Sequence, residues 1–116
     1  MQEYDINALF EQYGAVEELE IDEGFAEHMS EEARQYEKHK VSFKEVRQMH
    51  AGSPEYFLNE GVERRAPVII VGPTNTGRMI VVPIEPTRKK GVWHPITAFE
   101  ANAHHKERYE ERRRYE

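Results

Sequence analysis

The stretch Arg65-Ala-Pro-Val-Ile-Ile-Val-Gly-Pro-Thr-Asn-Thr-Gly-Arg-Met-Ile-Val-Val-Pro-Ile84 decides the fold. Two runs rich in β-branched residues, 68–71 and 79–84, flank a segment of Gly, Pro, Thr and Asn, which is the pattern of a β-hairpin. We therefore expect two long antiparallel strands joined by the loop 72–77. Pro67 and Pro83 lack the N–H that a strand ladder uses, so each is expected at a strand start, an edge or a bulge.

Shorter elements are predicted after this hairpin. A basic turn at 87–91 leads to a third strand over 92–97, which Pro95 is expected to interrupt. Asn102 is a suitable N-cap for a final helix. The charged end of that helix, residues 109–116, is expected to fray.

Before the hairpin the pattern is mainly helical. A helix is predicted over 5–13 and ends at Gly14, because apolar residues recur on one helical face. These residues are Ile6, Leu9, Phe10 and Tyr13. A second helix is predicted over 23–37, and short strands are predicted over 16–21 and 55–58.

The best-defined local signal is a helix start at Ser42. Ser42-Phe-Lys-Glu45 matches a capping box, in which the hydroxyl and the carboxylate each accept a hydrogen bond from the other residue's backbone N–H. Val41 and Val46 occupy the positions of the accompanying hydrophobic staple. Gly52-Ser-Pro54 is expected to end this helix.

The order of elements predicts an α+β fold. We expect a small curved, mainly antiparallel sheet with N-terminal helices and a C-terminal basic helix. A chain of 116 residues is long enough for one domain with one core. We divide it into an N-terminal helical extension, residues 1–15, and a single domain, residues 16–116.

Charge is distributed unequally along the chain. Residues 1–60 hold 15 Asp and Glu against 5 Lys and Arg, whereas residues 61–116 hold 7 against 11. The basic half suits phosphate, and the acidic half suits a basic protein partner or serves solubility. Solvated surfaces of unequal sign are an equally simple interpretation.

Composition also limits the compartment. The chain has no cysteine, so disulfides and thiol chemistry are excluded. Its apolar runs are shorter than the roughly 20 residues that span a bilayer, and its N-terminus lacks the pattern of a secretory signal. We expect a cytoplasmic protein with no membrane partner.

Four segments follow one another in the order and spacing of a known toxin family. They are Ile21-Asp22-Glu23 with His28, Lys38-His-Lys-Val-Ser-Phe-Lys-Glu-Val46, Val71-Gly72 with Thr76-Gly-Arg-Met-Ile-Val-Val82, and Pro95-Ile-Thr-Ala98 ahead of a basic helix. Over residues 17–110 this series resembles the BrnT family, a branch of the RelE-like ribonuclease superfamily of bacterial toxin–antitoxin pairs.

The resemblance implies the toxin component of a type II toxin–antitoxin pair. Such a toxin is a metal-independent endoribonuclease that inhibits translation by cutting RNA, chiefly messenger RNA, and a cognate antitoxin protein neutralises it. No cofactor is implied. Contact with DNA is expected only through the antitoxin, which carries the DNA-reading domain in this family.

Metal-independent RNA cleavage assigns three roles to side chains. A base removes the 2′ proton, a cation stabilises the phosphate charge, and an acid protonates the leaving oxygen. By resemblance and by chemistry the catalytic candidates are His94, Arg78 and Lys106. His94 suits acid or base chemistry because its ordinary pKa is about 6.5. Arg78 and Lys106 suit the phosphate.

Four further residues are candidates for substrate binding. Arg64 and Arg65 precede the first hairpin strand, whereas His105 and Tyr109 lie on the final helix. Tyr109 suits stacking on a base. Its structural alternative is a helix residue that faces the core. The alternatives for His94 and Arg78 are a surface imidazole beside Trp93 and a hairpin charge paired with an acidic neighbour.

The chain departs from the family at the expected RNA-facing positions. Family members usually carry Arg where His94 and Phe99 stand, and Glu where His105 stands. The fold is less sensitive to these changes than the activity is. No metal is expected, because His104 and His105 are adjacent and therefore point about 100° apart on a helix.

Three hypotheses follow from the sequence. The first is the RNA-cleaving toxin. The second is a catalytically silent module with the same fold, which acts through protein–protein binding. The third is a regulator that reaches DNA only with its partner. Convergence of His94, Arg78 and Lys106 in one patch would favour catalysis, and their separation on different faces would favour the binding module.

Overall fold

The predicted hairpin forms the centre of the sheet. In the computed structural model, which describes residues 6–22, 24–25, 41–59 and 66–114, β3 (Val68–Pro73) pairs antiparallel with β4 (Met79–Pro86). Gly72 and Pro73 belong to β3, so the loop is shorter than the predicted segment 72–77. The loop closes with Thr74 N–H donating to the Arg78 carbonyl at 2.8 Å.

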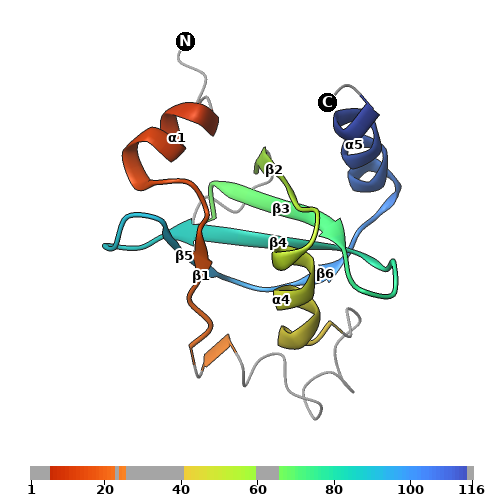
Figure 1. Ribbon diagram of the computed structural model, residues 1–116, viewed down its shortest axis with the longest axis horizontal. Coiled ribbons are helices and arrows are strands. Elements are labelled where there is room, and N and C mark those ends of the chain that lie inside the picture. Colours follow the sequence, from red (N-terminus) through yellow and green to blue (C-terminus); the bar gives the residue numbers. More distant parts are fainter. Residues whose placement is uncertain (1–5, 23, 26–40, 60–65, 115–116) are drawn as a thin grey trace.

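Four shorter strands complete a mixed, mostly antiparallel curved sheet, with the path β1-β5-β4-β3-β2 (Figure 1). β2 (Glu55–Leu58) pairs antiparallel with β3, and β5 (Val92–Pro95) pairs antiparallel with β4. β1 (Glu18–Leu19) runs parallel to β5 at the edge. β6 (Phe99–Glu100) also pairs with β4. The helices flank this sheet, and the predicted α+β class is confirmed.

Pro83 lies in the middle of a central strand, which differs from the expected strand start, edge or bulge. β4 changes partner around this residue, because it pairs with β6 at residues 80–81 and with β5 at residues 84–86. The Pro83 carbonyl accepts a hydrogen bond from Ile96 N–H at 2.9 Å, from the segment between those two strands. Pro83 therefore lies at a gap in the ladder, where a backbone N–H would have no regular strand partner, so its lack of an N–H leaves no ladder hydrogen bond unmade.

The helix predicted at Ser42 is present as α4 (Phe43–Ala51). Ser42 Oγ accepts from Glu45 N–H at 3.2 Å, and Glu45 Oε1 accepts from Ser42 N–H at 3.0 Å, which is the complete capping box. Val41 and Val46 are both buried, as expected of the staple positions. Gly52 caps the end of the helix.

The N-terminal helix packs on the same core as the rest of the sheet. α1 (Ile6–Tyr13) ends at Gly14, whose positive φ of 86° suits glycine. A Cβ at Gly14 would lie 2.5 Å from the Gly91 nitrogen, so the close approach of the two backbones also requires glycine. Gly91 N–H donates to the Tyr13 carbonyl at 2.8 Å, which joins α1 to the basic turn 87–91.

The C-terminal helix is longer than expected. α5 (Ala103–Arg114) includes most of the tail that was predicted to fray. Three of its side chains are tied to β2 and to the turn before it, and these contacts hold the last turns of the helix. Asn102 Oδ1 accepts from His105 N–H at 2.9 Å, so the predicted N-cap is confirmed.

Two apolar clusters lie on the two faces of the sheet. The larger, called here the α4-side core, contains Leu9, Val46, Met49, Val68, Ile70, Ile80, Val82, Ile84 and Trp93, with other buried residues. The smaller, called the α5-side core, contains Phe57, Ile69, Val71, Val81 and Ala101. Even-numbered residues of β4 therefore face α4, and odd-numbered ones face the side of α5, as strand alternation requires. In Figure 1, α1 stands at the upper left and α5 at the upper right of the sheet.

The helix predicted over 23–37 lies almost wholly outside the described residues. Within the described ranges, none of the helices combines the length and the apolar character that a membrane crossing requires.

Candidate functional site

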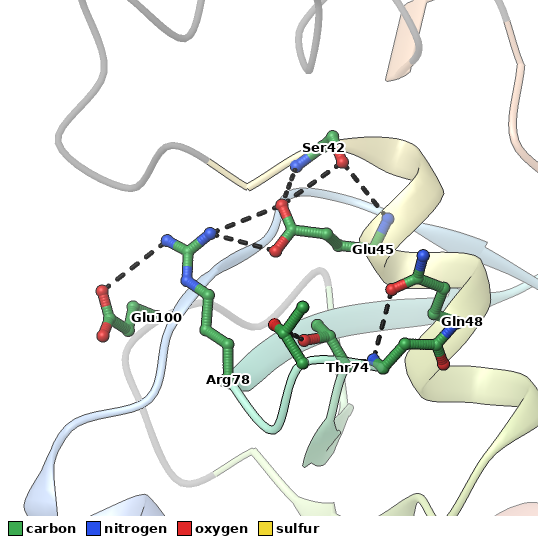
Figure 2. A network of polar contacts seen from close by, with 8 residues as sticks. Ser42, Glu45, Gln48, Thr74, Arg78 and Glu100 are labelled. Carbon is green, nitrogen blue, oxygen red and sulfur yellow. Dashed lines mark hydrogen bonds and ion pairs between the residues drawn. The ribbon is translucent and has the colours of Figure 1, made fainter.

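Arg78 lies between two carboxylates on the α4 side of the sheet (Figure 2). Its Nη1 is 3.1 Å from Glu45 Oε2, and its Nη2 is 3.6 Å from Glu100 Oε2. Glu45 belongs to α4 and Glu100 to β6, so the guanidinium joins a helix and a strand at the start of β4. These contacts agree with the structural alternative for Arg78, in which the guanidinium pairs with an acidic neighbour.

Glu45 has two tasks in this network. It completes the capping box through Ser42 and also pairs with Arg78, as Figure 2 shows. Burial raises the pKa of Glu45, but the Ser42 backbone N–H and the Arg78 guanidinium outweigh burial and bring the pKa below its ordinary value. The carboxylate is therefore ionised at neutral pH and holds the positive charge of Arg78 in place.

His94 is held between two other carboxylates. Its Nδ1 is 3.2 Å from Glu85 Oε1, and its Nε2 is 3.0 Å from Asp22 Oδ2. Only 19% of the His94 side chain is exposed. A doubly protonated imidazolium would donate to both acids at once. Asp22 has a lowered pKa, first because Phe25 N–H donates to it at 2.8 Å and then because His94 is near.

Arg78 and His94 lie on opposite faces of the sheet. Trp93 belongs to the α4-side core, so the next residue, His94, faces the other side, together with its register partner Glu85. Arg78 contacts Glu45 of α4, which places it on the α4 side. The seven residue steps from Arg78 to Glu85 also span about 23 Å along an extended strand. The two candidates are therefore separated both by the sheet and by its length.

The third catalytic candidate, Lys106, is on α5. Its side chain is exposed, and its neighbours on the helix, His105 and Tyr109, are half-buried. Tyr109 packs against the α5-side core, and its hydroxyl donates to the Ser53 carbonyl at 2.7 Å. Tyr109 thus faces the core, which is the structural alternative to base stacking given above.

His105 is poorly suited to bind phosphate in this conformation. Burial lowers the pKa of His105, and the charges of His104 and Arg108 lower it further. Its ring lies 6.2 Å from that of Phe99, centroid to centroid. The buried Nδ1 of His105 has no hydrogen-bond partner among the described residues. A neutral imidazole brings no charge to an anionic substrate.

α5 is fastened to the sheet mainly by its basic residues. The guanidinium carbons of Arg108 and Arg112 lie 4.6 and 4.2 Å from the centroid of the Phe57 ring. Arg113 Nη1 is 3.2 Å from Glu55 Oε2, and the Glu55 carboxylate is almost wholly buried. These cations stabilise the packing of α5 on the sheet. The Glu55 carboxylate and the Phe57 ring partly balance their positive charge.

Glu55→Gln is expected to loosen α5 without unfolding the sheet. Glu55 pairs with both Arg112 and Arg113, whose guanidinium groups are partly exposed. Loss of these pairs costs roughly 1 kcal/mol of local stability, so α5 amides should exchange about fivefold faster with solvent deuterium. Glu111→Gln, on an exposed position of the same helix, is the matched control. Equal exchange rates in α5 for the two variants would show that the Glu55 carboxylate does not hold the helix.

Arg64 and Arg65 lie outside the described residues. Among the residues that the structure does describe, no three His, Asp or Glu side chains are grouped so that they could hold a metal ion. Of the described candidates, Arg78 and His94 lie on opposite faces of the sheet, and Lys106 is an exposed residue of α5.

A feature that the sequence prediction missed is a hollow of about 480 Å³ beside β1. Glu17, Glu18, Leu19, Glu20 and Ile21 line it on one side, and Arg47, His50 and Ala51 of α4 line it on the other. The sequence signal for this feature is the run Glu17-Glu-Leu-Glu20, because three acids around one apolar residue indicate a strand with one charged face. Only the tertiary structure places this strand beside α4.

Comparison with known proteins adds no family. No family model, no curated protein and no solved structure matches this chain. The resemblance to BrnT toxins therefore stays a prediction that rests on the quoted sequence segments.

Proposed function

We propose that this chain is a protein-binding module on a RelE/BrnT-like scaffold and that it lacks ribonuclease activity. The observation that carries the proposal is the separation of Arg78 and His94, which lie on opposite faces of the sheet and near opposite ends of β4. The main ligand is then a protein partner. The sequence resemblance suggests a cognate antitoxin as its class.

The chemistry of RNA cleavage supports this choice. Base, cation and acid must all reach one phosphate and its two flanking oxygens, within hydrogen-bond distance of the reacting atoms. A gap of about 23 Å along the strand does not meet this requirement.

Charge pairing supports it as well. Arg78 has Glu45 and Glu100 beside it, and His94 has Asp22 and Glu85. Each group is thus surrounded by negative charge, which repels an approaching phosphate. In both places the pairs join different elements of the fold, so a structural role explains the residues that the resemblance assigned to catalysis.

Expression in a bacterial host, with growth and total RNA followed together, tests the proposal. We expect RNA to stay intact after induction, for the wild-type chain and for His94→Ala and Arg78→Ala alike. Growth arrest with intact RNA would agree with binding of an essential host protein. Fragmented RNA in the wild type, restored to intact RNA by His94→Ala, would overturn the proposal and establish the toxin endoribonuclease.

A positive test looks for the partner itself. Native mass spectrometry of the chain, purified with its partners from cells that encode it, should show a complex with a second polypeptide at fixed stoichiometry. A chain that carries bound RNA and no second polypeptide would contradict the protein-binding function. This measurement does not depend on the choice of catalytic candidates.

A further inference from the structure

The hollow beside β1 combines an open strand edge with a helix wall. It is called here the β1–α4 groove and is defined by residues 17–21, 47, 50 and 51. β1 is the last strand on its side of the sheet, and β5 is its pairing partner within the described part of the chain. Such an edge can pair with a further strand.

The backbone of β1 is oriented for that pairing. Glu18 N–H donates to the Gly91 carbonyl at 3.1 Å, and Glu20 N–H donates to the Trp93 carbonyl at 2.8 Å, both toward β5. In a parallel strand the residue between them directs its N–H and C=O to the opposite edge. Leu19 therefore presents one donor and one acceptor to the groove.

The side chains of this edge are sorted by face. Leu19 is packed in the α4-side core and Ile21 packs against it, so the face toward α4 is apolar. Glu18 and Glu20 alternate with them, and both are exposed on the other face. Over residues 18–21, a strand added beside β1 would meet carboxylates at every second residue and apolar groups at the residues between.

The charge of the groove selects the occupant. Glu17, Glu18 and Glu20 bring three carboxylates, against the single guanidinium of Arg47. His50 Nε2 lies 3.3 Å from the Val16 carbonyl oxygen, so this ring nitrogen already has a partner within the chain. Across the described residues these three carboxylates make no ion pair with other side chains, so their charge is available to a ligand.

We propose that the β1–α4 groove binds an extended basic segment of a protein partner, which joins the sheet as a strand beside β1. Lys or Arg at alternate positions of that segment face Glu18 and Glu20, and small apolar residues between them face Leu19 and Ile21. The proposal rests on the protein-binding function and specifies its surface. Backbone pairing supplies affinity, and the alternating side chains supply specificity.

A short peptide serves as the probe. Acetyl-Val-Lys-Val-Lys-Val-amide places its two lysines opposite Glu18 and Glu20 when its five residues pair with residues 17–21, and its binding is measured by NMR titration of the labelled chain. We expect the largest amide shifts at Leu19 and its neighbours, with binding that weakens as salt is raised. The acidic analogue acetyl-Val-Glu-Val-Glu-Val-amide should not bind. Equal binding of the two peptides, or no binding of the basic one, would overturn the proposal.

Variants separate charge from backbone pairing. Glu18→Gln with Glu20→Gln should weaken the basic peptide roughly 3- to 10-fold, the worth of two exposed pairs. Glu110→Gln with Glu111→Gln, on exposed positions of α5, is the matched control and should leave affinity unchanged. A basic peptide with N-methylated valines should lose binding. Unweakened binding of that peptide would show attraction by charge alone and contradict strand addition.

The same variants distinguish this proposal from the broader one. If a native partner binds the Glu18→Gln, Glu20→Gln chain as tightly as the wild type, the groove is not its site, and the protein-binding function still stands. If no protein partner is found and RNA is cleaved, the function itself fails. Circular dichroism of the double variant confirms that it is folded in each experiment.

Discussion

Trp93→Ala is expected to remove about 3–5 kcal/mol from the free energy of unfolding. A domain of this kind is stabilised by about 5–15 kcal/mol in total, so the variant should be marginally folded at best. Urea denaturation followed by circular dichroism measures the loss. Fluorescence is unsuitable because Trp93 is the only tryptophan of the chain.

The large effect follows from the position of Trp93. The side chain is fully buried in β5, and its Nε1 donates to the Gly14 carbonyl at 3.0 Å. Phe10 and Tyr13 of α1 meet the indole edge to face, with ring centroids 5.9 and 6.2 Å away. The indole thus attaches the N-terminal helix to the sheet.

A conservative variant divides this effect into parts. Trp93→Phe keeps an aromatic ring but removes the hydrogen bond and part of the volume, so about half of the loss is expected. If Trp93→Ala unfolded at the same urea concentration as the wild type, α1 would not depend on the indole. The packing described for the N-terminus would then be incorrect.

Glu45→Ala is the second large change, with an expected cost of about 2 kcal/mol. The carboxylate completes the capping box, whose loss alone costs about 1 kcal/mol. It also binds Arg78, which would remain beside Glu100 as its main counter-charge. Thermal or urea unfolding of the variant against the wild type gives the difference.

The contribution of Glu45 should depend on pH in one direction. Its folded pKa is lowered below the ordinary 4.5, so the unfolded chain binds this proton more readily than the folded one. The stabilisation is complete above the ordinary pKa and is lost as pH falls through the folded pKa. Wild-type stability should therefore approach that of Glu45→Ala in acid, while the two differ fully near neutral pH.

A double-mutant cycle tests whether Glu45 and Arg78 act together. Glu45→Ala, Arg78→Ala and the double variant should show an interaction of about 0.5–1 kcal/mol. Ser42→Ala reports on the cap alone. Strict additivity of the Glu45 and Arg78 variants would mean that the pair at 3.1 Å contributes nothing to stability.

Local chemistry explains which parts of the fold could be predicted. The capping box at Ser42 and Glu45 depends on four consecutive residues, so the sequence contains the whole signal. The hairpin was predictable for the same reason, because β-branched runs flank a short Gly-containing loop. Pro83 was harder, since its tolerance depends on where β4 exchanges one partner strand for another.

The site depended on information that the sequence does not present locally. Whether Arg78 and His94 share a face is decided by the β4–β5 register, and a shift of one residue would reverse the answer. Their carboxylate partners Asp22 and Glu45 lie 72 and 33 residues away in sequence. The tail was misjudged because the ties of α5 to Ser53 and Glu55 are equally remote.

The parallel pairing of β1 with β5 also has a consequence for synthesis on the ribosome. Leu19 pairs beside Trp93, so the N-terminal segment emerges long before its neighbour in the sheet exists. At about 5–20 residues per second, the intervening residues take roughly 4–15 s to make. During that delay β5, the strand that pairs with this segment, has not yet been synthesised. Repulsion among Glu17, Glu18 and Glu20 hinders premature association of the segment with another nascent chain.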